Sequence, residues 1–199
     1  MKNLFTITGF QRYIANTSWL IAEKIIRLAV GLFVGVWVAR YLGPEQFGTL
    51  SYAQAFVGLF GAVATLGMDG IVIKHLVKDE GNSDLLLGTA FTLKLLSAMV
   101  ALVFIGIVAV TTSNDNKDII IITIIASALV FQSLNVIDFY FQSKVLSKYI
   151  VLVNLISQLI ASLIRIALIL TNAPLIAFAY VILFDALILA VGYIYVYKH

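Results

Sequence analysis

The chain contains no cysteine and only two histidines, which excludes disulfide bonds, thiolate nucleophiles and cysteine-based metal sites and leaves little for a histidine-rich zinc site. Charged residues are also scarce, at 12% of the chain against about 25% in an ordinary soluble domain. Hydrophobic residues instead make up 62% of the 199 positions. This balance predicts a polytopic membrane protein without redox or metal chemistry.

Motifs typical of soluble enzymes are missing as well. The sequence has no glycine-rich phosphate loop, no nucleophile beside a base, and no basic and aromatic patch suited to nucleic acid. We therefore expect no enzyme activity, no catalytic or metal site, no cofactor and no nucleic-acid partner. Residues 1–17 lack a signal-peptide core and cleavage site, so we expect them to be retained as a cytoplasmic or interfacial segment.

Long apolar runs account for most of the remaining chain, residues 18–199. A hydrocarbon core of about 30 Å needs about 20 helical residues to cross it. Six runs are long enough: about 18–42, 47–68, 85–110, 119–141, 149–170 and 175–197. Because backbone groups in lipid must be satisfied within each segment, runs of this length predict helices and not barrel strands. The expected fold is an all-α bundle of six transmembrane helices.

Short polar segments separate these runs. Gly43 followed by Pro44 predicts the end of one helix and the start of the next, since glycine suits a helix C-terminus and proline fits a first turn. Asn172 and Pro174 predict a second tight turn for the same reasons. We expect residues 74–84, which include His75, to form a solvated loop.

The distribution of basic residues predicts the orientation of the bundle. With the N-terminus in the cytoplasm, seven lysines and arginines fall in inside segments and two in outside segments. The inside set is Lys2, Arg12, Lys74, Lys78, Lys144, Lys148 and Lys198, and the outside set is Arg40 and Lys117. Because cytoplasmic loops carry an excess of lysine and arginine, both termini are expected in the cytoplasm.

The first run carries charges at its cytoplasmic end. Glu23 and Arg27 are four residues apart, so they can form an ion pair on one helix face. Gly31 and Gly35 continue the same face, and small residues of this kind let another helix approach closely. We interpret Glu23, Gly31 and Gly35 as a structural ion pair and packing stripe.

Other charged residues lie within the later spans. Lys94 and Asp185 interrupt otherwise apolar runs, Asp138 belongs to a polar face of the fourth run, and Arg165 belongs to one of the fifth. A charge at the centre of a span costs roughly 2.5–3.5 kcal/mol on insertion scales. Such residues are therefore expected to face protein or a polar cavity, which is typical of a transport pathway.

Structural interpretations of the same residues stay open. Glu23, Lys24 and Asp138 lie close enough to span ends for interfacial or structural roles. Lys94 and Asp185 could form a salt bridge with each other and serve packing alone.

Two segments carry a family resemblance. VARYLGPEQFGTLSYAQAFVGLF and the following LGMDGIVIKHLVKD resemble the N-terminal region of the Wzx-like polysaccharide and O-antigen flippases of the multidrug/oligosaccharidyl-lipid/polysaccharide superfamily. The Gly-Pro turn, the Phe-Gly after it, the Tyr-Ala-Gln entry and the Gly-x-Asp-Gly exit follow the family's order. After Leu85 the resemblance consists of span number, spacing and polar placement.

The resemblance implies a function in lipid transport. Members of this family move undecaprenyl-pyrophosphate-linked oligosaccharide repeat units across the bacterial inner membrane for surface polysaccharide or lipopolysaccharide synthesis. On this basis Arg27, Lys94 and Arg165 are candidate contacts of the anionic substrate, because arginine and lysine bind phosphate groups. Asp138 and Asp185 are candidates for coupling to a proton or sodium gradient.

The resemblance also implies two lobes of six helices, and this chain resembles the first. We expect a truncated N-terminal lobe; a half-transporter completed by another chain, a homodimer and contact with polysaccharide assembly proteins are alternatives. Two further functions stay open: a cation-coupled multidrug exporter of the same superfamily, and a membrane scaffold that transports nothing.

Overall fold

The fold is all-α, as predicted. The computed structural model describes residues 3–64, 67–78, 80–112 and 115–198, and the regular elements in these ranges are all helical. The long helices are α1 (Asn3–Ala64), α3 (Ser83–Thr112), α6 (Ser147–Leu170) and α7 (Leu175–Lys198). The shorter elements are α2 (Asp69–Lys78), η1 (Glu80–Asn82), α4 (Asn116–Gln132), η2 (Ser133–Asn135) and α5 (Val136–Ser143).

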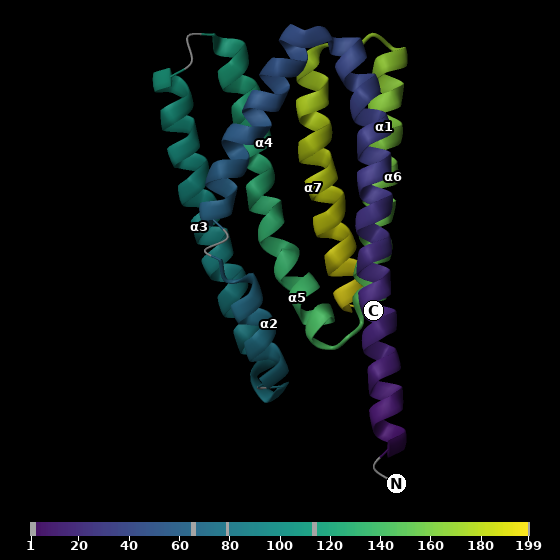
Figure 1. Cartoon of the computed structure of the whole chain (residues 1–199). Helices are drawn as coiled ribbons and strands as arrows, with labels where there is room; N and C mark the ends of the chain where they lie inside the picture. The colour runs from purple at the N-terminus through teal and green to yellow at the C-terminus, as the bar shows by residue number, and fades with distance from the viewer. Residues whose placement is uncertain (1–2, 65–66, 79, 113–114, 199) are drawn as a thin grey trace.

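Helix α1 contains a sharp bend at the predicted Gly-Pro turn. Gly43 has φ 72° and ψ 174°, outside the helical region, and Pro44 begins the next helical turn. The chain reverses there, so that α1 has a first arm before Gly43 and a second arm after it, and both arms belong to the bundle (Figure 1). Glycine is required because other residues rarely adopt this backbone conformation.

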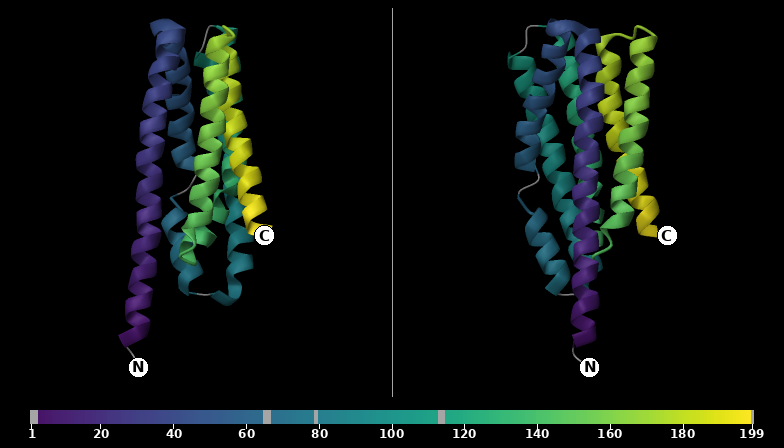
Figure 2. Two further views of the ribbon diagram at one scale, coloured as in Figure 1. Left: turned by 90° about the vertical axis from the view of Figure 1, so that its right-hand side faces the viewer. Right: turned by 45° about the vertical axis from the view of Figure 1, so that its right-hand side comes forward.

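Five helical stretches in the described ranges are long and apolar enough to cross a membrane. The first, Asn16–Ala62, has 47 residues and includes the bend at Gly43. It therefore holds both the first and the second predicted spans, and the chain is a multi-pass membrane protein. α1 is also helical from Asn3 onward, so residues 3–17 continue the axis of the first arm and extend beyond the bundle (Figure 2). Their cytoplasmic or interfacial location stays a prediction.

The loop expected at residues 74–84 is wrong for its first half. Residues 69–78 form α2, and His75 lies on this helix. The reason is an apolar face: Leu76 is buried in a cluster with Leu87 and Phe139 of neighbouring helices, and Val72 packs against the same cluster. The second predicted span thus ends at Ala64, and Gly67 takes a left-handed φ of 60° before α2 begins.

The fourth predicted span is also interrupted. α4 ends at Gln132, one turn of 3₁₀-helix follows as η2, and α5 continues from Val136. A short 3₁₀ segment inside a helical run often marks a functional site or a point of strain. Both interruptions, at Gly67 and at η2, border the same cavity, described below.

Helices α6 and α7 complete the bundle and pack on each other. α6 also packs along the first arm of α1, and α7 packs along α4. The main core is built from both arms of α1 together with α3, α4 and α7, and Ile105, Ile122 and Ala179 are among its fully enclosed residues. The N-terminal end of α1 and the C-terminal end of α7 lie toward the same end of the bundle, opposite the bend of α1 (Figure 1).

Candidate functional site

One polar cavity lies in the half of the bundle near Gly43. It has a volume of about 240 Å³, and we call it the Arg165 cavity. Both arms of α1 contribute to its wall together with α6 and α7. Its lining residues are Gly31, Gly35, Val38, Phe47, Leu50, Ser51, Gln54, Arg165, Phe178 and Ile182.

Arg165 is the charged residue of this wall. It is half-buried on α6 and forms no hydrogen bond or salt bridge with any residue that the structure describes. Asp185 attracts it electrostatically, but from beyond salt-bridge distance. Ser51 and Gln54 add neutral polar groups to the same wall. A guanidinium carries five donors, so this cavity has donors available for an anion.

Gly31 and Gly35 form another part of the wall. A Cβ placed on either glycine would meet no atom of a described residue within 4 Å. Within the described chain, these glycines therefore leave space beside Arg165 instead of receiving a neighbouring helix. Their predicted role in close packing stays a prediction for contact with another lobe or chain.

A separate cavity lies in the other half of the bundle. Its volume is about 190 Å³, and we call it the Lys94 cavity. It lies where both helix interruptions meet α3, and its wall is more polar than that of an ordinary core. The lining residues are Gly61, Asp69, Lys94, Ala98, Leu129, Gln132, Ser133, Asn135, Asp138 and Phe139.

Lys94 is already paired inside this cavity. Its side chain is 6% exposed, and its Nζ donates to Asp69 Oδ1 at 2.7 Å. The ammonium also lies 4.3 Å from the centre of the Phe139 ring, which adds a cation–π contact. The alternative of a salt bridge between Lys94 and Asp185 is therefore wrong. Asp69 is the partner because α2 carries it against the middle of α3.

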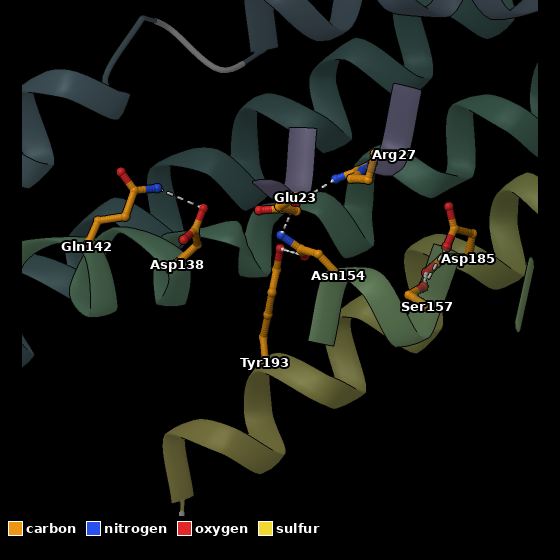
Figure 3. A network of polar contacts seen from close by, with 8 residues as sticks. All are labelled: Glu23, Arg27, Asp138, Gln142, Asn154, Ser157, Asp185 and Tyr193. Carbon is orange, nitrogen blue, oxygen red and sulfur yellow. Dashed lines mark hydrogen bonds and ion pairs between the residues drawn. The ribbon is translucent and has the colours of Figure 1, made fainter. Parts of the chain in front are cut away.

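Asp185 lies elsewhere, on α7 facing α6. Ser157 Oγ donates to Asp185 Oδ1 at 2.5 Å and lies 3.3 Å from the Asp185 carbonyl oxygen. This hydroxyl satisfies one carboxylate oxygen (Figure 3). Asp185 therefore contacts α6 through Ser157, and Lys94 takes no part in this contact.

A hydrogen-bonded network joins α1, α6 and α7 (Figure 3). Glu23 is 6% exposed and accepts from Asn154 Nδ2 at 2.8 Å and from Arg27 Nη1 at 3.4 Å, both at Oε1. Tyr193 donates its hydroxyl to Asn154 Oδ1 at 2.8 Å. The Arg27 side chain is 44% exposed, so it is the open end of the network. Glu23 and Arg27 thus lie together as the sequence spacing suggests.

Asp138 lies beside this network on α5. Gln142 Nε2 donates to Asp138 Oδ2 at 3.0 Å. The other oxygen, Oδ1, is buried and has no hydrogen-bond partner among the described residues. In Figure 3, Asp138 and Gln142 lie beside Glu23. Asp138 therefore lines the Lys94 cavity and lies beside the Glu23 network.

The sequence that forms these helices and polar cavities also matches a known protein family. The family model described as polysaccharide biosynthesis protein matches residues 13–199. The chain belongs to this family. The resemblance to Wzx-like polysaccharide biosynthesis proteins is thereby confirmed over nearly the whole sequence. Neither a curated protein nor a solved structure matches this polysaccharide biosynthesis family member.

Sequence reasoning on this family member missed Tyr193 and the partner of Lys94. Tyr193 lies eight residues after Asp185 on α7, about two helical turns along the same face, and this spacing could have revealed it. The pairing of Lys94 with Asp69 required knowing that the chain folds into α2 immediately after Gly67. No local signal gives the direction that α2 takes.

Proposed function

We propose that this protein translocates undecaprenyl-pyrophosphate-linked oligosaccharide repeat units across the bacterial inner membrane, and that the Arg165 cavity contacts the pyrophosphate. The observation that carries the proposal is the Arg165 guanidinium, which has no hydrogen-bond or salt-bridge partner among the described residues and lies in the wall of a cavity inside a membrane-spanning bundle. An intramembrane ionisable residue usually serves a pathway or a binding site. Arginine binds phosphate oxygens through two parallel hydrogen bonds, which suits a pyrophosphate group.

The family supports this assignment of the ligand. A membrane protein of polysaccharide biosynthesis is expected to bind a lipid-linked sugar. A cavity of about 240 Å³ is too small for a whole oligosaccharide, since ligand pockets for drug-sized molecules measure about 300–1,000 Å³. The cavity would hold the charged phosphate group, and the sugars would extend along the open face of α1.

The other two basic candidates, Arg27 and Lys94, differ in how available they are to the substrate. Arg27 is an accessible second contact, although it would have to share its charge with Glu23 at 3.4 Å. Lys94 could reach the substrate only by leaving Asp69, so we rank it last among the candidate substrate contacts. Asp138 and Asp185 are the acids that we propose for coupling to a proton or sodium gradient.

The arrangement of the lobe in the membrane is part of the proposal. We propose six crossings, with the bend at Gly43 on the periplasmic side and both termini in the cytoplasm. The common position of the two termini at one end of the bundle supports an even number of crossings (Figure 1). The glycine face beside Arg165 would then meet a second lobe, supplied by the same polypeptide, another chain or a second copy.

Binding of a polyprenyl pyrophosphate tests the proposal directly. The protein in lipid nanodiscs should bind undecaprenyl pyrophosphate, and Arg165→Gln should weaken this binding at least tenfold. The expected loss follows from charge-assisted hydrogen bonds worth about 1.5–3 kcal/mol. Arg165→Lys should retain part of the affinity, because it keeps the charge and loses the paired donors.

Matched controls separate this function from the alternatives. Undecaprenol, which lacks the pyrophosphate, should bind equally to both forms, and Arg40→Gln should behave as the unsubstituted protein. Equal affinity of the Arg165→Gln variant and the unsubstituted protein for the pyrophosphate would contradict the proposal. Binding of amphipathic cations that is unaffected by Arg165→Gln would indicate the multidrug exporter instead.

A further inference from the structure

One groove of the bundle is apolar over most of its wall and has a carboxylate at one end. Its volume is about 390 Å³, and we call it the Asp84 groove. Helix α3, the η2–α5 segment and the last turn of α7 form its wall. The apolar lining residues are Leu87, Phe91, Leu134, Val136 and Ile137. The groove is separate from the Arg165 and Lys94 cavities, because it shares no lining residue with either.

The groove arises because α3 and α7 do not pack on each other within the described part of the chain. η2 and α5 lie between them and pack on both helices, so they form the floor (Figure 1). Gly88 widens the groove, since a Cβ added there would meet no atom of a described residue within 4 Å. From Asp84 to Phe91 the wall follows α3 for about 10 Å, at about 1.5 Å per residue. In a membrane-spanning bundle, an apolar groove of this size suits a lipid chain.

The polar end of the groove consists of Asp84 and Tyr197. The Tyr197 hydroxyl donates to Asp84 Oδ1 at 3.4 Å. The Tyr140 ring packs edge-on against the Tyr197 ring, with centroids 5.6 Å apart, and so fixes its position. Asp84 is exposed and forms no salt bridge with any residue that the structure describes. A carboxylate beside an aromatic ring favours an ammonium ligand, through charge-assisted hydrogen bonds and through the ring face.

The two ends of the groove together match the two parts of a phospholipid. Asp84 lies in the first turn of α3 and Tyr197 in the last turn of α7. The polar end therefore coincides with helix ends, where lipid head groups and tyrosine side chains meet. The apolar part extends from there along α3 toward the middle of the bundle. The Asp84 carboxylate attracts a head group that carries an ammonium and repels one that is only anionic.

We propose that the Asp84 groove binds one phospholipid with a primary ammonium head group, of the phosphatidylethanolamine class. The ammonium lies between Asp84 and Tyr197, and one acyl chain lies over Gly88 along the η2–α5 floor. This lipid fills the gap between α3 and α7. The site goes beyond the proposed transport function and stands independently of it, since no residue of the Arg165 cavity takes part.

Native mass spectrometry of the full chain, equilibrated in detergent with equimolar phosphatidylethanolamine and phosphatidylglycerol, tests the site. The unsubstituted protein should retain one phosphatidylethanolamine, with a preference of at least about fivefold, the low end for a charge-assisted hydrogen bond at an exposed site. Asp84→Asn should abolish the preference. Gly88→Leu should abolish lipid retention, because the added side chain fills the groove, and Ile137→Trp should do the same from α5.

Matched controls exist for both kinds of substitution. Asp118→Asn removes an acid from the first turn of α4, and Gly106→Leu enlarges another glycine of α3 that has free space around it. Neither residue lines the groove. Both variants should retain phosphatidylethanolamine with the preference of the unsubstituted protein.

Three results would overturn the proposal. Equal retention of the two lipids by the unsubstituted protein would refute the ammonium site. Undiminished retention in Gly88→Leu and Ile137→Trp would mean that the lipid binds elsewhere on the bundle. Displacement of the phospholipid by undecaprenyl phosphate would identify a prenyl chain as the occupant. Arg165→Gln should keep the lipid preference while losing pyrophosphate affinity, so either proposal can fail alone.

Discussion

The basic residues of the two cavities differ in burial and in pairing. Lys94 is buried, paired with Asp69 at 2.7 Å and covered by the Phe139 ring. Arg165 is half-buried, has no partner within salt-bridge distance in the described ranges, and lies beside glycines with empty space around them. Burying a charge is costly whether or not it is paired. The difference in pairing therefore indicates different roles: Lys94 holds helices together, and Arg165 remains available to a ligand.

The largest expected effect concerns the Lys94 pair. Asp69→Asn should lower the free energy of unfolding by about 3 kcal/mol, since removing one partner leaves an uncompensated buried charge. We choose the low end of the usual range because the Asp69 side chain is 52% exposed. Chemical denaturation in detergent measures the loss. Lys94→Met added to Asp69→Asn should recover at least half of it, and a double variant as unstable as the single one would contradict the pairing.

The second prediction compares two glycines near the Arg165 cavity. Gly43→Ala should destabilise the protein by about 2 kcal/mol, because its backbone conformation is nearly restricted to glycine. Nothing lies within 4 Å of the added Cβ, so the cost comes from the backbone alone. Gly35→Ala is the control, with a helical backbone and equal space, and should leave stability within about 1 kcal/mol. Thermal melting of both variants measures the contrast; equal melting temperatures would refute it.

The third prediction concerns the network beside the Lys94 cavity. Tyr193→Phe removes the hydrogen bond to Asn154 without changing the packed ring and should cost about 1 kcal/mol. Tyr180→Phe, on the same helix with an exposed side chain, serves as the comparison. Denaturation midpoints under identical detergent conditions report the difference. A Tyr193→Phe variant no less stable than Tyr180→Phe would show that the network does not stabilise the fold.

The smallest expected effect on stability concerns Arg165. Arg165→Met should change the free energy of unfolding by less than about 1 kcal/mol or stabilise the protein, because no described partner is left unpaired. The same denaturation assay used for Asp69→Asn provides the measurement. A loss as large as that of Asp69→Asn would mean that Arg165 is structural.

Much of the fold could be predicted from the sequence. Apolar run lengths gave the membrane class and the helical spans, and the Gly43-Pro44 pair gave the reversal, because these signals are local. The spacing of Glu23 and Arg27 likewise predicted a contact inside one helix. The helix at residues 69–78 was missed because its short apolar face lies among charged residues, and its burial depends on α3 and α5.

The site was less accessible to sequence reasoning. Lys94, Arg165, Asp138 and Asp185 stood out because charges are rare in apolar runs. Which of them are paired depends on helix rotation and on contacts far apart in the chain, such as that between Lys94 and Asp69. The space around Gly31 and Gly35 illustrates the same limit, since small residues can mark either close packing or an opening.

One contact of the fold also sets an order of assembly. The Asn16 side chain accepts a hydrogen bond from the backbone N–H of Ser147, at the start of α6, across 131 residues of sequence. At roughly 5–20 residues per second of synthesis, the asparagine waits on the order of ten seconds for its partner. In the newly made protein, this contact of the first helix therefore forms only after the start of the fifth span has been synthesised.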